Sequence, residues 1–200
     1  MAGTRSATLS RPPRSVTDSD EKLMLRAGTG DREACETLVQ RHLGRVVGFA
    51  QRTLGNRSDA EDVAQDVFLR VWSAAPRWKL ESARFTTWLY RVAMNVCLDR
   101  IAKKREALTD ETPELIDAES EPSRALHASE VARHVTAALA SLPDAQRIAV
   151  TLCHYQGLRN RDAAEVMDVS VEALESLLAR GRRAMRAQLF DVAPELLGTG

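Results

Sequence analysis

Apolar residues recur at spacings of three and four along most of this chain, which is the periodicity of amphipathic helices. A clear example is the run of Val63, Val67, Phe68, Val71 and Trp72. No segment alternates β-branched residues between turn signals, as a half-buried strand would. An apolar content of 44% is enough to give such helices a buried core. The sequence therefore predicts an all-α fold.

Turn and capping residues divide the pattern into separate helices. Gly55-Asn56 is typical of a left-handed helix end, and Ser58 with Glu61 forms a capping box that begins the next helix. Pro143 is expected in the first turn of another helix. The expected helices cover about 31–54, 58–76, 86–105, a segment ending near 142, 143–157, 160–167 and 171–190.

An acidic, proline-containing stretch separates two helical blocks. Residues 106–123 cannot bury much surface, so we expect them to form a flexible, extended linker. The predicted architecture is thus two small helical domains joined by an acidic linker. Its parts are a disordered tail at 1–19, a first domain at 20–105, the linker, a second domain at 124–192 and a tail at 193–200.

Charge is segregated along the chain, although 28 basic and 28 acidic residues give a net charge of zero. Residues 91–105 hold five basic residues and one acid, and residues 177–190 hold four arginines and no acid. Residues 106–130 hold eight acids and one arginine. The balanced total therefore hides two basic patches, which are compatible with nucleic-acid binding.

The last two expected helices, with a three-residue turn between them, form a helix-turn-helix unit. Ser170 is placed to cap the second helix, which in such units enters the major groove of DNA. The apolar positions expected to hold the two helices together are Ala164, Met167, Val169 and Leu174. The candidate DNA-contacting residues are Ser170, Ser176, Arg180, Arg182, Arg183 and Arg186. A helical hairpin with a solvated basic face is the alternative.

A second candidate nucleic-acid segment interleaves aromatic and basic residues between positions 77 and 105. Single-stranded DNA binds where bases can stack on aromatic rings and phosphates can follow positive charge. Periodicity favours Trp88 as a core residue, so Phe85 and the loop before it are the better base-contact candidates. The candidate contacts are Lys79, Arg84, Phe85, Arg91, Lys103, Lys104 and Arg105, with Trp78 and Tyr90 as further aromatics.

The polar face of the 58–76 helix is strongly acidic. Taken alone, this pattern favours a solvated helix face, because acids are common near helix N-termini. No phosphate-binding glycine loop, nucleophile elbow or metalloprotease motif is present, so we expect neither an enzyme nor a cofactor. Cys35, Cys97 and Cys153 are scattered, which argues against a disulfide framework, and their spacing to histidines predicts no metal site.

Three stretches together resemble the extracytoplasmic-function family of RNA polymerase sigma factors. Residues 59–72 are similar to the family's core-polymerase-binding helix, and residues 85–99 to its promoter-melting and −10-reading segment. Leu142-Pro143, the turn at Gly157 and the helix-turn-helix resemble its −35-reading domain. The matching segments span residues 21–190 and follow one another in the same order as in the family. The resemblance implies that the protein recognises a promoter with two elements.

The resemblance assigns roles to the three candidate surfaces. The 58–76 helix would bind the β′ clamp helices of core polymerase through Asp59, Glu61, Asp62, Gln65, Asp66, Leu69 and Arg70. The 79–85 loop, with Ser82 and Asn95, would capture a flipped base of the −10 element, at a cost of a few kcal/mol that the pocket and stacking return. The family's acidic linker threads the polymerase near the RNA exit path.

The resemblance also implies the partners and the setting of the protein. The expected partners are core RNA polymerase, through the β′ clamp helices and the β flap, promoter DNA and an anti-sigma factor. The expected function is an alternative sigma factor in a stress response. No small-molecule substrate and no direct membrane insertion are expected, because no apolar run is long enough to span a bilayer. The expected location is the cytoplasm, where an anti-sigma factor could hold the protein at the inner membrane.

The recognition helix departs from the family's usual pattern. Glu172, Glu175 and Leu177 stand where the family commonly has neutral or basic residues, which predicts a divergent −35 preference. Two alternatives stay open at the level of sequence. One is a sigma mimic that sequesters an anti-sigma factor, and the other is a conventional dimeric helix-turn-helix regulator.

Overall fold

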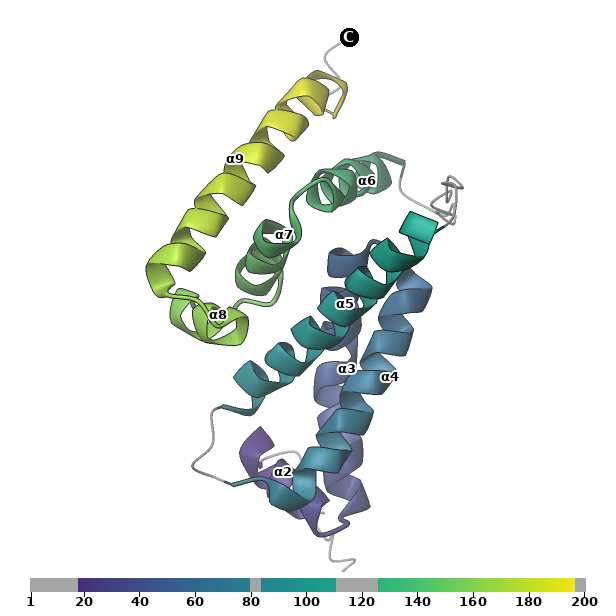
Figure 1. The fold of residues 1–200 in the computed structure, drawn as a ribbon, viewed down its shortest axis with the longest axis vertical. Coiled ribbons are helices and arrows are strands. Elements are labelled where there is room, and N and C mark those ends of the chain that lie inside the picture. The colour runs from purple at the N-terminus through teal and green to yellow at the C-terminus, as the bar shows by residue number, and fades with distance from the viewer. Residues whose placement is uncertain (1–17, 80–83, 111–125, 197–200) are drawn as a thin grey trace, which may run out of the picture.

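A computed structural model describes residues 18–79, 84–110 and 126–196, and every regular element in these ranges is helical, which confirms the all-α prediction (Figure 1). The N-terminal group consists of α2 (Asp20–Gly28), α3 (Arg32–Leu54), α4 (Arg57–Ala74), the 3-10 turn η1 (Ala75–Arg77) and α5 (Phe85–Asp110). The C-terminal group consists of α6 (Leu126–Ala140), α7 (Asp144–Val150), the π-helical turn η2 (Thr151–Tyr155), α8 (Asn160–Met167) and α9 (Val171–Leu196). The expected N-terminal tail up to residue 17, Ser82 and residues 111–123 of the expected linker lie outside the described residues.

Helices α3, α4 and α5 pack together and bury one apolar face each. Fully buried residues on these faces include Leu38, Phe49, Val67 and Leu89. Helix α5 reaches Asp110 instead of ending near Arg105, so the first residues of the expected linker continue the helix. None of the described helices has the length and apolarity needed to cross a bilayer.

The boundary between α3 and α4 is partly as expected. Gly55 ends α3 in a left-handed conformation, with φ of 75°, as the sequence predicts. The predicted capping box is wrong, because Asn56 is the N-cap of α4 and its side chain accepts from the Asp59 amide at 3.0 Å. Ser58 therefore lies inside the helix. Asparagine is as good an N-cap as serine, so the choice depends on where the chain leaves the left-handed turn.

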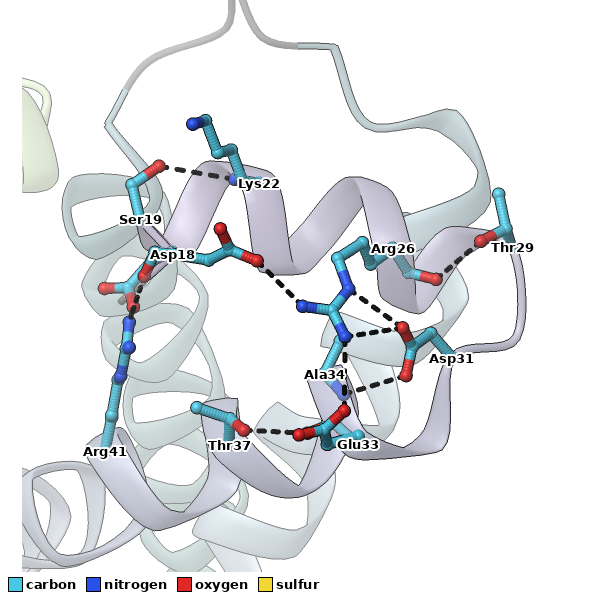
Figure 2. Close-up of polar contacts among 11 residues, drawn as sticks. Asp18, Ser19, Lys22, Arg26, Thr29, Asp31, Glu33, Ala34, Thr37 and Arg41 are labelled. Atoms are coloured by element: carbon cyan, nitrogen blue, oxygen red, sulfur yellow. Dashed lines mark hydrogen bonds and ion pairs between the residues drawn. The ribbon is translucent and has the colours of Figure 1, made fainter. Parts of the chain in front are cut away.

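Helix α2 was not among the expected helices, and it covers one end of the α3–α4 pair. Its Leu23 and Met24 are fully buried, and Ser19 caps its N-terminus. Figure 2 shows the turn that joins it to α3, where the Arg26 guanidinium bridges Asp18 at 2.7 Å and Asp31 at 2.7 Å. Asp31 also accepts from the Ala34 amide and so caps α3. The hydrogen bond from Arg26 lowers the pKa of the Asp31 carboxyl, which keeps this cap ionised.

A partly buried group of polar side chains ties the start of α2 to the middle of α3. Asp20 accepts from His42 at 2.8 Å and from Arg41 at 2.8 Å, and His42 is only 4% exposed. Burial raises the pKa of Asp20, but the hydrogen bonds from His42 and Arg41 outweigh burial and lower the pKa overall. This group therefore fixes α2 beside the first turn of α5, where Phe85 packs edge-on against His42.

Glu21 of α2 caps the N-terminus of α5 from a distance in the sequence. Its Oε1 accepts from the Phe85 amide at 3.1 Å, and α5 has no acid of its own in its first turn. We expect Glu21→Ala to lower the free energy of unfolding by about 1 kcal/mol, since an orphan helix amide loses its acceptor. Urea unfolding measures this change.

Two variants separate the cap from general charge effects. Glu21→Gln keeps an acceptor oxygen and is expected to retain most of the stability. Glu36→Ala removes an acid that is 59% exposed and pairs with the exposed Arg32, so its effect should stay below about 0.5 kcal/mol. Equal losses for Glu21→Ala and Glu36→Ala would contradict the capping role.

The C-terminal group is built around α9, which packs against α6, α7 and α8. Pro143 is the N-cap of α7 and lies just before the helix, so the expected first-turn position is one residue out. The segment expected as one helix to Gly157 instead changes to a π-helical turn at Thr151. The two groups are in contact, because α5 packs on α8 and α3 packs on α6, α7 and η2 (Figure 1).

Candidate functional sites

The acidic face of α4 is open to solvent. The apolar face of this helix, from Ala60 to Val71, is buried in the core. Six of the seven candidate polymerase-binding residues are exposed and Asp59 is half-buried: Asp59, Glu61, Asp62, Gln65, Asp66, Leu69 and Arg70. Leu69 has 57% of its surface exposed, so an apolar side chain lies among the polar ones on this face. The structure thus leaves this helix face available to a partner.

The guanidinium of Arg100 in α5 lies close to three of these acids, and the sequence did not predict this cluster. Its Nη1 lies 3.4 Å from Asp59 and 3.2 Å from Asp62, and its Nη2 lies 3.9 Å from Asp66. Arg70 lies 3.9 Å from Asp99. No local pattern could have revealed this cluster, because Arg100 is far from the acids in sequence. Arg100 therefore places one positive charge beside three acids of α4.

The aromatic cluster beside α5 reverses the expected order of burial. Phe85 is fully buried, so its ring cannot stack on a base in this structure and the prediction for Phe85 is wrong. Trp88 is half-buried and lies 5.3 Å from Trp78 between ring centroids, with Phe85 packed against both. Tyr90, also expected in the aromatic track, is 1% exposed. The partly exposed rings are therefore Trp78 and Trp88.

One strip of α5 joins these tryptophans to polar residues. Arg84, Trp88, Arg91 and Asn95 follow one another at spacings of three and four, so they share one helix face. Arg84 and Asn95 are exposed, while Trp88 and Arg91 are half-buried. The other candidate −10 residues are exposed but lie off this strip: Lys79 in the preceding loop, and Lys103, Lys104 and Arg105 near the helix end.

The helix-turn-helix is formed as predicted. Asp168 ends α8 in a left-handed conformation, with φ of 53°, and Ser170 accepts from the Ala173 amide at 3.1 Å as the N-cap of α9. Ala164 and Leu174 are buried between the two helices and Met167 is half-buried, but Val169 is 37% exposed and does not hold the helices together. Ala163, Val166 and Leu178, which were not among the expected positions, are also buried in these two helices.

The arginines of α9 are divided between two faces of the helix. Ser176, Arg180 and Arg183 are exposed and lie on one face at spacings of four and three. Arg182 and Arg186 line a groove of about 510 Å³ on another face, together with His154, Tyr155 and Phe190. The candidate −35 residues therefore do not form one surface, because Arg182 and Arg186 line the groove and Ser176, Arg180 and Arg183 do not.

The acids of the recognition helix already have local partners. Asn160 of α8 donates to Glu175 at 3.3 Å, which links the two helices of the unit. The Glu172 pKa is lowered by its own backbone amide and by Ser170 at the helix start. These contacts explain how two acids are tolerated near the N-terminus of a helix that is otherwise basic.

Comparisons with known proteins match both domains. A family described as Sigma-70 region 2 matches residues 38–107, and one described as Sigma-70, region 4 matches residues 133–185. The chain is 32% identical to the ECF RNA polymerase sigma factor SigE of Mycolicibacterium smegmatis, over 84% of this chain and 67% of that protein. It is 30% identical to the RNA polymerase sigma-H factor of Pseudomonas aeruginosa, over 89% of this chain and 97% of that protein.

Solved structures show the same arrangement of helices. CnrH, solved in complex with the cytosolic domain of CnrY, is 28% identical with a TM-score of 0.66, over 87% of this chain and 99% of CnrH. RpoE of Bartonella quintana, solved with the anti-sigma factor NepR, shares the fold with a TM-score of 0.67, at 21% identity, over 77% of this chain and 95% of RpoE. With both sigma regions matched in order, the chain belongs to the extracytoplasmic-function family of RNA polymerase sigma factors.

Proposed function

We propose that this sigma factor uses three separate helix faces to start transcription. The acidic face of α4 binds the β′ clamp helices of core polymerase, the α5 strip reads the −10 element and one face of α9 reads the −35 element. The observation that carries the proposal is that the polar faces of α4 and α9 are exposed and the α5 strip is partly exposed, whereas the apolar faces of these helices form the core. The protein is an initiation factor and not an enzyme.

For the −10 element, the strip of Arg84, Trp88, Arg91 and Asn95 replaces the surface centred on Phe85. Trp88 offers a partly exposed ring for base stacking, and the flanking arginines suit the phosphates. Lys79 and Ser82 precede the strip, and Lys103, Lys104 and Arg105 extend positive charge along α5. The element is read from the single strand, where unstacked bases can reach the protein.

For the −35 element, the contacts come from the face of α9 that carries Ser176, Arg180 and Arg183. This face follows the capped N-terminus that helix-turn-helix units insert into the major groove. Arg182 and Arg186 instead border the apolar groove. They are therefore not part of the proposed −35 surface. The main role of Ser170 is to cap α9. Any contact it makes to DNA is at the N-terminus of this helix.

The proposed regulation follows the family. An anti-sigma factor would hold the protein inactive, in the cytoplasm or at the inner membrane, until a stress signal releases it. In support, the similar protein CnrH was solved in complex with the cytosolic domain of CnrY. The polymerase β flap is the further partner expected for region 4.

Run-off transcription from a genomic fragment library tests this proposal. Purified core polymerase with this protein should give new, discrete start sites that share two upstream elements. Asp62→Ala with Asp66→Ala should reduce core binding, whereas Glu36→Ala, which removes an exposed acid on α3, should not. The paired acids matter because both lie on the open face of α4.

Two other outcomes would point to the alternatives. Binding to a palindromic duplex without polymerase would favour a dimeric helix-turn-helix regulator. Absence of both start sites and core binding, with retained binding to an anti-sigma factor, would favour a sigma mimic. Asn160 engages Glu175, so this acid gives the mimic less support than its position in the sequence suggests.

A further inference from the structure

Glu172 lies on the face of α9 that carries the proposed −35 contacts. Ser176 and Arg180 follow it at spacings of four, so the three side chains share one side of the helix, and all three are exposed. Ala173 and Ala179, which are also exposed, flank this line with short side chains. A helix that enters the major groove with this face therefore brings an acid to the DNA as well as an arginine.

The Glu172 carboxylate can act only as a hydrogen-bond acceptor. Hydrogen bonds from its own backbone amide and from the Ser170 hydroxyl lower the pKa of the Glu172 carboxyl, which keeps it ionised at neutral pH. Ser170 also accepts from the Ala173 amide at 3.1 Å, so these contacts lie together in the first turn of α9. An ionised carboxylate has no proton to give, and at a promoter it can bind only a group that donates.

The base edges in the major groove offer two such donors. They are the N4 amino group of cytosine and the N6 amino group of adenine. On adenine, the acceptor N7 lies beside the amino group and repels a carboxylate, whereas cytosine has no ring-nitrogen acceptor at that place. Glutamate therefore favours cytosine. A neutral glutamine instead pairs with N6 and N7 of adenine together.

The second acid of this helix, Glu175, is held differently. It lies about 100° around the helix from Ser176, at the edge of the proposed DNA-reading face. Its Oε1 accepts from the side-chain amide of Asn160 in α8 at 3.3 Å. Glu175 thus carries the same charge close to Glu172, but its carboxylate is engaged within the helix-turn-helix.

We propose that Glu172 is a specificity-determining residue that selects a cytosine in the −35 element. Arg180 follows Glu172 by about 12 Å along the helix axis. Successive base pairs of B-form DNA are about 3.4 Å apart, so the cytosine lies within about four base pairs of the base that Arg180 contacts. The proposal rests on the proposed function, because it requires α9 to read the −35 element.

A base contact and simple charge repulsion have opposite consequences for Glu172. An acid that faces only phosphates weakens binding to every DNA sequence, so its removal would strengthen binding to all sequences alike. An acid that accepts from cytosine stabilises one base at one position, so its removal weakens binding only to elements with that cytosine. The sequence dependence of binding therefore separates the two roles.

The experiment measures the −35 preference of holoenzyme assembled from core polymerase and the full-length protein. Promoters found in the run-off assay, with the −35 region randomised, compete for the holoenzyme, and the bound fraction is sequenced. Wild type is compared with Glu172→Gln and Glu172→Ala. Glu175→Gln is the matched control, because it removes the same charge from the same end of α9. Circular dichroism verifies that each variant keeps its helix content.

We expect the wild type to prefer cytosine at one −35 position by at least about fivefold over the other bases. Glu172→Ala should lose this preference, and Glu172→Gln should change it to adenine at the same position. Glu175→Gln should keep the wild-type preference. Its affinity should change by less than about threefold and equally for all sequences, because only long-range repulsion of phosphates is removed.

Three results would overturn the role of Glu172. They are a cytosine preference that survives in both Glu172 variants, a uniform gain in affinity for all sequences in these variants, and loss of the cytosine preference in Glu175→Gln. A wild-type preference that includes no cytosine would also overturn it, while leaving the proposed function intact. If the wild-type holoenzyme shows no −35 preference at all, the proposed function of α9 fails, and the role of Glu172 fails with it.

Discussion

Replacing Gly28 with alanine is expected to lower the free energy of unfolding by at least about 2 kcal/mol. A Cβ atom at this position would lie 2.4 Å from the carbonyl oxygen of Ala75 and 3.2 Å from the Cα of Pro76. Both are backbone atoms, so α2 and η1 would have to move apart. That movement would disturb Trp78 and the Glu21 cap, which lie at the same end of the domain. Urea unfolding measures the loss.

Gly44→Ala provides the matched control for this prediction. Gly44 lies in α3, and a Cβ there would meet no atom within 4 Å. Both substitutions restrict the unfolded chain similarly, so that contribution cancels in the comparison. We expect Gly44→Ala to raise the free energy of unfolding by about 0.5–1 kcal/mol, because alanine is the better helix former. Equal stability of the two variants would show that α2 and η1 do not approach as closely as described.

Replacing Arg180 with alanine is expected to weaken binding of the holoenzyme to the −35 element about 5- to 150-fold, the range of one base-contacting arginine. Arg180 is exposed on the same face of α9 as Ser176 and Arg183. If it contacts a base, the loss should depend on the sequence of the element. Competition between wild-type and altered −35 duplexes measures both quantities.

Arg186→Ala removes the same charge from the same helix and serves as the control. Arg186 lines the apolar groove beside His154 and Phe190, away from the face of Arg180. We expect less than a threefold change in −35 affinity for this variant, since only long-range attraction to phosphates is lost. Similar losses for both variants would mean that α9 binds DNA through its total charge, and the division into two faces would be wrong.

The sequence was informative where the signal is local. The left-handed turn at Gly55, the Ser170 cap and the acidic face of α4 depend on residues within one or two helical turns. The sequence was misleading where two local signals compete. Asn56 and Ser58 are both good caps, and only the path of the chain after Gly55 selects Asn56.

Only the tertiary structure shows which aromatic residues are buried. Helical periodicity identifies the inward face of α5, but it does not say how far neighbouring elements cover that face. Phe85 is covered because α2 reaches it through Glu21 and because His42 and Trp78 pack on its ring. Trp88 lies at the edge of that cover and stays half-exposed.

By itself, the sequence determined the helices, the helix-turn-helix and the order of two sigma regions, because these follow from spacing, capping and charge along the chain. The tertiary structure alone decided which residues from distant segments meet. It brought Arg100 to the acids of α4, Glu21 to the start of α5 and Gln156 to Tyr90. Such contacts depend on how helices cross and dock, and neither periodicity nor local capping encodes that geometry.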